Sequence, residues 1–451
     1  MARLDSFKAY DIRGRIPDEL DEALAYDIGR AFAAFVKPRR VAVGYDIRQS
    51  SPSLAAALKR GLRDLGSDVL DIGLFGTEGA YFATFAERLD GGAMVTASHN
   101  PPDYNGMKFV REGARPLSGD TGLFEMRELI ARGALPGKAP RAGTEQPLDI
   151  VPRYLEHLLG YVAVQELRPL KVVVNAGNGG AGLIVDRLEP HLPFDFVKIN
   201  NEPDGSFPHG VPNPMLEENR AATADAVRRS GADVGLAWDG DYDRCFFFDE
   251  NGQFIEGYYL VGLLAETFLR LEPGARIVHD PRLTWNTLDI VRRNGGTPVL
   301  CKSGHAFIKA KMREVDAVYG GEMSAHHYFR RFAYCDSGMI PWLLVLAVMS
   351  AHGEPLSALV GERMRLFPAS GEINRKLAAD TQSILARVRA RYETAAIALD
   401  LTDGLSLEFE RWRFNLRGSN TEPLVRLNVE SRADEALMRE KTAELLRLID
   451  S

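Results

Sequence analysis

Short apolar runs alternate with longer segments of helical period along most of the chain. Residues 41–45 and 171–174 are strand-like runs rich in Val, and each leads into a segment of helical period, 51–65 and 181–188. A similar apolar run returns at 232–237. Strands that alternate with helices predict mixed, mostly parallel sheets covered by helices.

Glycine and proline mark the breaks in this alternation. They are concentrated in residues 133–152 and 367–371, whereas 250–252 is either a third break or a hairpin turn. A chain of 451 residues is too long for one core and is expected to form about three or four domains. Length and breaks thus leave three or four domains open, depending on whether 250–252 is a break.

The pattern changes after residue 371. A helix is expected at 380–398, strands around 405–409 and 425–429, and a final helix at 433–448. This order predicts a smaller α+β domain at the C-terminal end.

Composition and charge exclude some classes of partner. The chain has 45% hydrophobic and 26% charged residues, as soluble globular proteins do. Its formal net charge of -7 argues against a nucleic-acid partner and against an anionic membrane. A protein of this charge that binds an anionic substrate must gather positive charge locally, so single Arg and Lys residues in loops become candidates.

Cysteines and apolar stretches bear on location. Cys245, Cys301 and Cys335 form no disulfide framework and no paired metal motif, which predicts a reducing cytoplasm. Residues 1–6 lack the apolar core of a signal peptide. The longest apolar stretch, 339–351, contains a proline and is too short to span a bilayer, so we expect a buried helix there.

Residues 96–101 read Thr-Ala-Ser-His-Asn-Pro and follow a buried strand-like run. Core packing does not explain the hydroxyl of Ser98 at this place, whereas a nucleophile does. His99, Asn100 and the downstream Lys108 supply donors and proton carriers. We do not expect Ser98 and His99 to form a dyad, because neighbouring side chains usually diverge, and no GxSxG elbow is present.

Asp239, Asp241 and Asp243 lie two residues apart in a short loop and can direct three carboxylates toward one point. A hard cation such as Mg²⁺ suits such a point. The spacing also matches a calcium EF-hand, but Arg244 occupies the position that requires glycine there, and the flanks read as strands. A solvated acidic hairpin is disfavoured because both flanks are apolar.

Two further loops carry polar side chains. Glu322, Ser324 and His326 fall within residues 321–327, and such groups can bind sugar hydroxyls. His305 stands in a similar polar turn, where it alone is more often structural. The Gly-rich residues 175–182 have no Walker or clean GxGxxG pattern, so we expect tight packing there rather than nucleotide binding.

The segment from residue 417 is suited to a phosphate. Gly418 permits close approach, Arg417 and Arg426 offer forked charge-assisted contacts, and three side chains can donate hydrogen bonds. These three are Ser419, Asn420 and Thr421. A hydroxyl nucleophile, a metal loop and phosphate-binding residues together predict phosphoryl transfer through a covalent phosphoserine.

Four motifs, in order, resemble the α-D-phosphohexomutase family, and most closely its bacterial phosphomannomutase/phosphoglucomutase branch. They are the Ser98 segment, the Asp loop, the Glu322 loop and the Arg417 loop, and the resemblance begins already at residues 7–14. The resemblance implies four domains around a central cleft, three topologically related α/β domains at residues 1–145, 146–250 and 251–368 and a smaller C-terminal α+β domain at residues 369–451. It also implies that Ser98 carries the phosphoryl group and that Ser98 and the three aspartates bind Mg²⁺.

The same resemblance implies further roles. Tyr10, Arg13, Lys108 and Arg244 are expected at the active site with His99. Glu322 and Ser324 are expected to contact the sugar hydroxyls, with His305 and His326 nearby. Two residues depart from the family pattern: Ala325 stands where relatives usually have Gly, and Arg282 where they often have Lys.

The predicted activity is a cytoplasmic mutase that interconverts mannose 6-phosphate and mannose 1-phosphate, and also the glucose phosphates. A hexose 1,6-bisphosphate is the intermediate and activator. Three alternatives stay open, namely a glucosamine-phosphate mutase, disfavoured by Met323 where those enzymes have Gln, a phosphatase, and an inactive sugar-phosphate sensor. The sequence predicts no nucleic-acid or membrane partner and leaves the oligomeric state and the sugar preference undetermined.

Overall fold

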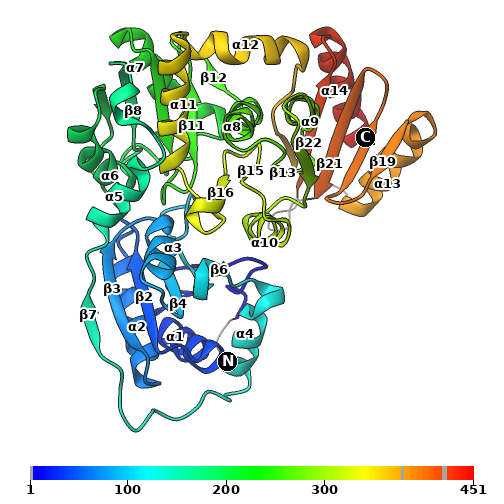
Figure 1. The fold of residues 1–451 in the computed structure, drawn as a ribbon. Helices are drawn as coiled ribbons and strands as arrows, with labels where there is room; N and C mark the ends of the chain where they lie inside the picture. The colour runs from blue at the N-terminus through cyan, green and yellow to red at the C-terminus, as the bar shows by residue number, and fades with distance from the viewer. Residues whose placement is uncertain (1–3, 377–379, 419–423, 451) are drawn as a thin grey trace. The chain divides into compact units, whose positions relative to one another are not determined.

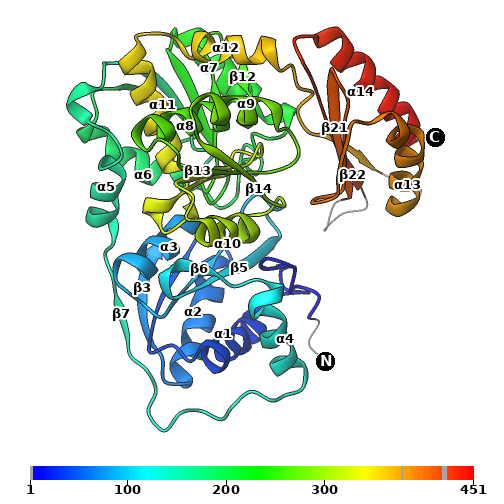
Figure 2. The same ribbon diagram turned by 45° about the vertical axis from the view of Figure 1, so that its right-hand side comes forward.

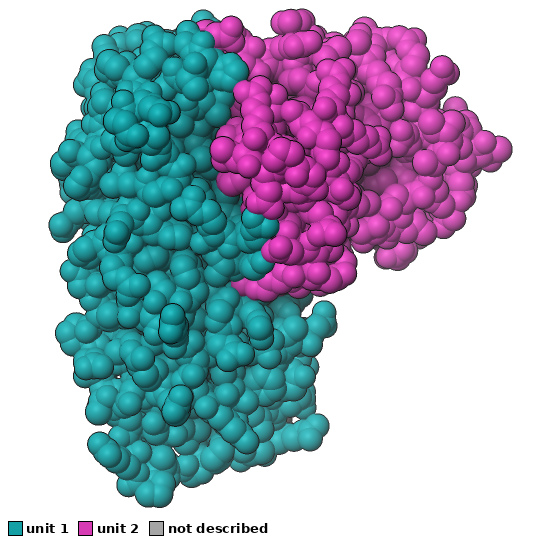
Figure 3. Space-filling model, in the orientation of Figure 1, with its two compact units in different colours: residues 1–254, 328–353 teal, residues 255–327, 354–451 magenta. Residues whose placement is uncertain are grey.

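The computed structural model describes residues 4–376, 380–418 and 424–450 (Figure 1). The chain divides into two compact units. Unit 1 consists of residues 1–254 with 328–353, and unit 2 of residues 255–327 with 354–451 (Figure 3). The described residues form four sheets.

The first sheet of unit 1 is built from the N-terminal part of the chain. Its strands are β1 (Ile12–Arg15), β2 (Arg40–Tyr45), β3 (Asp68–Leu74), β4 (Gly91–Val95), β5 (Tyr104–Arg111), β6 (Arg115–Pro116) and β7 (Glu145–Pro147). Their order is β1-β5-β4-β2-β3-β7, with β6 paired to β5. β2 is parallel to β3 and β4, whereas β5 is antiparallel to β4 and β1.

Four helices accompany this sheet. They are α1 (Glu22–Val36), α2 (Ser51–Asp64), α3 (Thr77–Ala86) and α4 (Leu123–Ala131). Asp21 caps α1 by accepting a hydrogen bond from the amide of Leu24, and α1 packs between α2 and α4 (Figure 2). The core behind this contact includes Ile28, Phe32 and Leu58, all fully buried. The helix α3 packs against β4, which places its first residues beside the carboxyl edge of the sheet.

The second sheet of unit 1 follows. Its strands are β8 (Lys171–Asn175), β9 (Asp195–Ile199), β10 (Val234–Trp238), β11 (Cys245–Phe248) and the edge strand β12 (Phe254–Ile255), and its helices are α5 (Val151–Leu159), α6 (Ala181–Leu188) and α7 (Ala221–Ser230). β10 is parallel to β8 and antiparallel to β11. The β10–β11 hairpin therefore carries residues 239–244 at its turn.

Residues 328–353 complete unit 1. β16 (His327–Phe329) pairs with β17 (Cys335–Asp336) through Tyr328 and Phe329, and α11 (Met339–His352) follows. Residues 339–346 of α11 are all buried, so the expectation of a buried helix is confirmed. Among the described residues no single helix is long and apolar enough to cross a membrane, and only α11 taken together with α12 (Leu356–Leu366) meets that test of length and composition.

Unit 2 begins with three strands and four helices. They are β13 (Arg276–His279), β14 (Thr297–Leu300), β15 (Tyr319–Gly321), α8 (Gly257–Leu271), α9 (Trp285–Arg293), α10 (His305–Val315) and α12. β13 is parallel to both β14 and β15. The turns that follow β13 and β15 carry residues 280–284 and 322–326.

The fourth sheet is antiparallel throughout. It has the order β18-β22-β21-β20-β19. Its elements are β18 (Ile373–Lys376), β19 (Ala398–Asp400), β20 (Leu405–Glu408), β21 (Trp412–Gly418) and β22 (Leu424–Ser431), with α13 (Thr381–Tyr392) and α14 (Glu435–Asp450). Phe414, Leu427 and Val429 form the core against these two helices.

The predicted α/β class, with a C-terminal α+β part, is confirmed. The helix expected at 380–398 is too long, because α13 ends at Tyr392 and residues 398–400 are strand β19. Pairing of β19 with β20 satisfies the backbone groups of these residues in the sheet, so tertiary pairing overrides their local helical pattern.

Candidate active site

Ser98 lies in a buried turn just after β4. Its backbone φ is +50°, in the left-handed region that non-glycine residues rarely adopt. The buried guanidinium of Arg48 donates to the carbonyl oxygen of Ser98 at 2.9 Å, and the amide of Ser98 donates to Thr96 Oγ1 at 3.0 Å. These contacts hold the strained turn and fix the direction of the Ser98 hydroxyl.

The β10–β11 turn brings its carboxylates to this hydroxyl. Ser98 Oγ donates to Asp239 Oδ2 at 3.1 Å. A Cβ atom at Gly240 would lie 2.5 Å from Ser98 O, so only glycine allows the two turns to approach this closely. Two segments more than a hundred residues apart in sequence therefore form one site within unit 1.

The three aspartates of the turn are buried. One ligand oxygen of each lies within 4.8 Å of the others. Within the described residues, Oδ1 of Asp241 and Oδ1 of Asp243 have no hydrogen-bond partner. Buried carboxylate oxygens without partners are costly, and a hard divalent cation accepts such oxygens as ligands. The residues present therefore fit the Mg²⁺ that the sequence predicts.

Lys108 completes the aspartate cluster. Its ammonium donates to Asp241 Oδ2 and to Asp243 Oδ2, each at 2.7 Å. Although burial opposes its charge, the two carboxylates raise the pKa of Lys108 well above its usual value. Burial, only partly offset by Arg244, raises the pKa of Asp239 to about 6. Lys108 therefore stays protonated, and it supplies positive charge and hydrogen-bond donors but does not serve as a base.

Arg244 and His99 line the other side of Ser98. Arg244 donates to Asp239 Oδ2 through Nε at 2.9 Å and through Nη2 at 2.6 Å, and its Nη2 also donates to His99 Nδ1 at 2.6 Å. Burial and then the charges of Arg244 and Arg13 lower the pKa of His99 well below its usual value. His99 is therefore a neutral imidazole whose Nδ1 is an acceptor.

The remaining N-terminal candidates lie on or before β1. Arg13 donates to Asp11 Oδ2 at 2.8 Å and to Asn100 Oδ1. Its side chain therefore connects β1 to the turn that contains Ser98. Tyr10 lies in the turn that precedes β1 and is half-buried.

Thr77 and Glu78, at the start of α3, are functional candidates that the sequence did not reveal. Thr77 Oγ1 donates to Asp241 Oδ2 at 2.5 Å and accepts from Lys108 Nζ at 3.2 Å. Glu78 is buried and accepts hydrogen bonds from Tyr154, from Ser337 Oγ and from the amides that begin α11. One feature of the sequence could have indicated them. Thr77 and Glu78 follow strand β3, and Ser98 follows strand β4, so all three lie at the carboxyl ends of strands in one sheet.

In unit 2 the loop after β15 and the turn before α10 meet. Glu322 Oε1 accepts from the amide of Gly304 at 2.9 Å, which places the turn of His305 beside the Glu322 loop. Ser324 Oγ and Glu322 Oε1 both accept hydrogen bonds from Arg282 Nη2, at 3.1 and 3.2 Å. Arg282, whose role the sequence left in doubt, is thus part of this loop.

Ala325 and His326 complete the loop. Ala325 has φ +68°, the left-handed conformation that glycine adopts at no steric cost. An alanine in this conformation carries strain of about 1 kcal/mol. The carbonyl oxygen of His326 accepts a hydrogen bond from the amide of Glu322 at 2.9 Å and closes the loop.

The phosphate candidates lie at the ends of β21 and β22. Arg417 and Arg426 are direct register partners across the two strands. The predicted donors Ser419, Asn420 and Thr421 lie outside the described residues. Both arginines contact Glu372, at 3.0 Å from Arg417 Nη2 and 3.4 Å from Arg426 Nη1.

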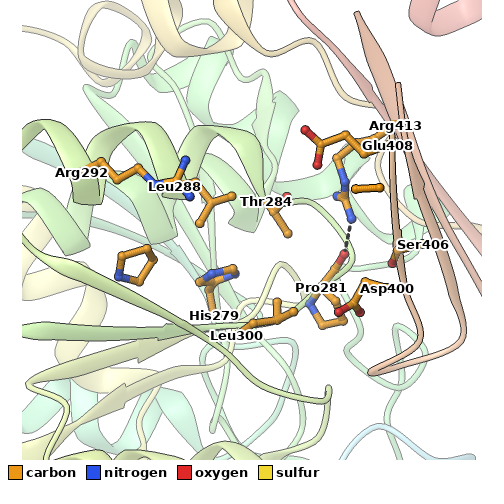
Figure 4. Close-up of a pocket in the computed structure, with 12 residues that line it drawn as sticks. His279, Pro281, Thr284, Leu288, Arg292, Leu300, Asp400, Ser406, Glu408 and Arg413 are labelled. Atoms are coloured by element: carbon orange, nitrogen blue, oxygen red, sulfur yellow. Dashed lines mark hydrogen bonds between the residues drawn. The ribbon is translucent and has the colours of Figure 1, made fainter. Parts of the chain in front are cut away.

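Unit 2 also contains a cavity of about 240 Å³ between α9, the ends of β13 and β14, and the sheet edge at β19 and β20 (Figure 4). His279 and Arg292 line one side, and Asp400 and Glu408 the other. None of the predicted site residues is among those lining it, so cavity size alone does not locate the chemistry in this chain.

A buried serine hydroxyl beside three carboxylates is an arrangement suited to phosphoryl transfer. Four family models match the chain. Phosphoglucomutase/phosphomannomutase domains I, II and III match residues 4–133, 152–252 and 256–367, and the C-terminal domain matches residues 372–447. The chain belongs to the phosphoglucomutase/phosphomannomutase family.

Similar proteins agree with this assignment. A phosphomannomutase of Escherichia coli is 59% identical over 456 residues, covering 100% of both chains. Phosphohexose mutases of Xanthomonas campestris pv. campestris are 60% identical over 446 residues, covering 99% of each. The solved structure of a phosphoglucomutase/phosphomannomutase family protein from Burkholderia thailandensis has a TM-score of 0.90 and 33% identity, covering 99% of this chain and 97% of that one.

A more distant structure shares the fold. An N-acetylphosphoglucosamine mutase of Aspergillus fumigatus, in complex with GlcNAc-6P and magnesium, has a TM-score of 0.61 and 14% identity, covering 100% of this chain and 96% of that one. At this identity the likeness shows the fold alone.

Proposed function

We propose that the protein interconverts the 6-phosphate and the 1-phosphate of mannose, and also of glucose, through phospho-Ser98 and a hexose 1,6-bisphosphate. The observation that carries the proposal is the buried hydroxyl of Ser98, directed at the Asp239 carboxylate in a strained turn. The relatives named phosphomannomutase support mannose as the sugar.

In the first transfer, the bond between phosphorus and Ser98 Oγ breaks and a bond to the free sugar hydroxyl oxygen forms. The hydroxyl proton leaves to a base that the described contacts do not single out. Arg244 and Lys108 supply positive charge and donors beside the transferred group. Mg²⁺ held by Ser98 and the three aspartates would neutralise charge on the phosphoryl group.

In the second transfer, the bond between the other phosphorus of the bisphosphate and its sugar oxygen breaks, and a bond from that phosphorus to Ser98 Oγ forms. The sugar oxygen gains a proton and leaves as a hydroxyl, and Ser98 Oγ must lose its own proton. His99 Nδ1 lies 3.0 Å from Ser98 Oγ, but its one lone pair already accepts from Arg244 Nη2 and its pKa is lowered, so it is a poor base. Lys108 is not suited to this role because it is already protonated. The Ser98 hydroxyl donates to Asp239 Oδ2 at 3.1 Å, and the proton therefore leaves toward Asp239 rather than to His99 or Lys108.

The substrate is bound by two groups of residues in unit 2. Glu322 and Ser324 contact the sugar hydroxyls, assisted by His305 and His326. Tyr10, which belongs to unit 1, is a further substrate-binding candidate. Arg417 and Arg426, with Ser419, Asn420 and Thr421, bind the phosphate that is not being transferred. A cytoplasmic location is supported by the three free, buried cysteines.

The test is a progress curve with enzyme first stripped of its phosphate. Trace hexose 1,6-bisphosphate should restore turnover of mannose 1-phosphate and of glucose 1-phosphate without being consumed in proportion to product. Full activity of the stripped enzyme without bisphosphate, or steady release of inorganic phosphate, would contradict the mutase reaction. Glucosamine 1-phosphate as the best substrate would identify the related mutase instead.

A further inference from the structure

Glu372 begins the C-terminal part of unit 2, immediately before β18. Its side chain is 6% exposed, whereas residues 374–376 farther along β18 are exposed. In the described part of the chain three guanidinium groups contact its carboxylate. Arg417 Nη2 and Arg282 Nη1 lie 3.0 and 3.3 Å from Oε2, and Arg426 Nη1 lies 3.4 Å from Oε1.

Arg282 extends this contact to the Glu322 loop. While its Nη1 contacts Glu372, its Nη2 donates to Asp280 at 2.8 Å and to the Glu322 carboxylate and Ser324 hydroxyl described above. Two nitrogens of one planar group are needed for both sets of contacts. A lysine, with a single nitrogen, could not make them simultaneously.

The backbone of Arg282 is fixed to the fourth sheet. Arg413, on β21, donates to the carbonyl oxygens of Pro281 at 2.8 Å and of Arg282 at 3.0 Å, the former drawn in Figure 4. Glu430 in turn holds Arg413 at 2.7 Å and accepts from the amide of Thr284 at 2.7 Å. The position of Arg282 relative to β21, and hence to Arg417 at its end, is therefore set by buried hydrogen bonds.

Glu372 is an ionised carboxylate at neutral pH. Burial opposes its charge, but Arg282, Arg417 and Arg426 lower its pKa to about 2. A carboxylate and a phosphate offer guanidinium groups the same forked acceptor geometry. The Nε of Arg417 has no hydrogen-bond partner among the residues that are described, so this side chain still has a donor for an incoming anion.

We propose that Glu372 is an internal competitor for the phosphate-binding arginines, a positioning residue that holds Arg417 and Arg426 between phosphates and helps each phosphate to leave. The inference rests on the proposed function, in which Arg417 binds the phosphate that is not transferred. The bisphosphate must release this phosphate in order to reorient between the two transfers. If the Glu372 carboxylate takes the place of the departing phosphate, Arg417 and Arg426 are never left without a counter-charge. The free energy needed to release the phosphate is therefore lower.

Arg282 gives this exchange a second consequence. When phosphate displaces Glu372 from Arg417 and Arg426, the carboxylate remains beside Arg282. Glu372 then interacts with Arg282 without competition from Arg417 and Arg426. The strength of the Arg282 hydrogen bonds to Glu322 and Ser324 changes in turn. Arrival of phosphate is thereby coupled to the loop that contacts the sugar.

The test compares Glu372→Gln with Asp403→Asn, each in the full chain with Ser98→Ala to prevent transfer. Asp403 is a matched control because it also neighbours Arg417, at 3.8 Å, but makes no ion pair with Arg282 or Arg426 among the described residues. Calorimetric titration with inorganic phosphate and with mannose 6-phosphate should give a Kd about tenfold lower for Glu372→Gln, since a like charge next to the anion is removed. Asp403→Asn should stay within about threefold of the Ser98→Ala parent.

Equal or weaker phosphate binding by Glu372→Gln would overturn the proposal, and so would equal tightening by Asp403→Asn. Glu372→Asp, which keeps the charge, should bind phosphate like the parent, and this result guards against misfolding of the amide variant. With Ser98 intact, Glu372→Gln should lower KM and kcat together, by about tenfold each, because tighter binding without better transfer slows release. If Glu372 served only to hold the structure of the site, the Glu372→Gln substitution would instead raise KM. The wild-type progress curve tests the proposed function separately, so the two failures are distinguishable.

Discussion

Ser98 Oγ lies 3.0 Å from His99 Nδ1 even though the two residues are neighbours in sequence. Neighbouring side chains usually diverge, and the expectation that these two would not meet is wrong. The left-handed backbone of Ser98 turns its side chain toward that of His99. Strain in the turn is thus what brings the hydroxyl and the imidazole together.

Ser98→Ala should abolish most mutase turnover and leave the fold intact, because only one oxygen is removed from a cavity-free turn. Intact-mass measurement of enzyme from cells should show one phosphate on the wild type and none on the variant. Ser53→Ala, an exposed serine on α2, is the control and should keep activity and phosphate. Near wild-type turnover of Ser98→Ala would exclude the covalent mechanism.

Asp241→Asn should lower kcat at least about a hundredfold while leaving sugar-phosphate binding largely unchanged. The variant removes a charge that balances Lys108 and is a proposed metal ligand. Mg²⁺ affinity measured by calorimetry without substrate should fall in parallel. Asp195→Asn, an exposed residue on β9, serves as the control. Unchanged affinity for Mg²⁺ in Asp241→Asn would rule out this turn as the metal site.

Thr77→Val should lower kcat/KM about ten- to a hundredfold, because a hydrogen bond to a charged group contributes about 1.5–3 kcal/mol. The valine keeps the shape of Thr77 but cannot donate to Asp241. Thr84→Val is a matched control on the same helix, since Thr84 donates only to the carbonyl oxygen of Ala80. Equal losses in both variants would mean that the helix, not the contact with Asp241, determines the effect. Mg²⁺ affinity provides the second readout.

Arg417→Ala should raise KM for every hexose phosphate by a similar factor of about ten to a hundred, because the proposed contact is to phosphate and not to the sugar. Arg411→Ala, an exposed arginine of the same sheet region, should leave KM unchanged. KM is measured for the mannose and glucose 1-phosphates in parallel. A change for one sugar only would show that Arg417 contacts the sugar.

His157 should make the stability of unit 1 sensitive to acid. Its ring lies among Phe82, Phe85 and Phe332, and burial, followed by the charge of Arg331, lowers its pKa to about 4. A lowered pKa means that the unfolded chain binds the proton more tightly. The part of the free energy of unfolding that depends on a neutral His157 is therefore fully present above about pH 6.5 and is lost as the pH falls toward 4.

His157→Phe should remove this part of the acid sensitivity, which we expect to be on the order of 1–2 kcal/mol after solvent screening of the partly exposed ring. The measurement is the unfolding midpoint in urea between pH 7 and pH 4.5. His191→Phe, at an exposed position, should follow the wild-type curve. If the unfolding midpoint of His157→Phe depended on pH as the wild type's does, the assignment of this acid sensitivity to His157 would be wrong.

The features that the sequence revealed are those whose residues lie close together in it. The Ser98 segment and the two-residue spacing of the aspartates each fit within a few residues, so residue types alone indicate their chemistry. Thr77, Asp280 and Glu372 were missed because their contacts join residues more than forty positions apart. Length and breaks indicated three or four domains and the family resemblance indicated four, whereas the exact limits and the roles of the site residues stay predictions.

Ala325 has a consequence for substrate range. A glycine at this place visits many backbone conformations, so a loop that contains it can adapt its outline to different partners. Alanine at φ +68° has few alternatives, and the outline of residues 322–326 is correspondingly fixed before any ligand arrives. For a loop proposed to contact sugar hydroxyls, this rigidity favours sugars that present the same hydroxyls to it, as mannose and glucose do except at C2, and a small loss of entropy when the sugar binds.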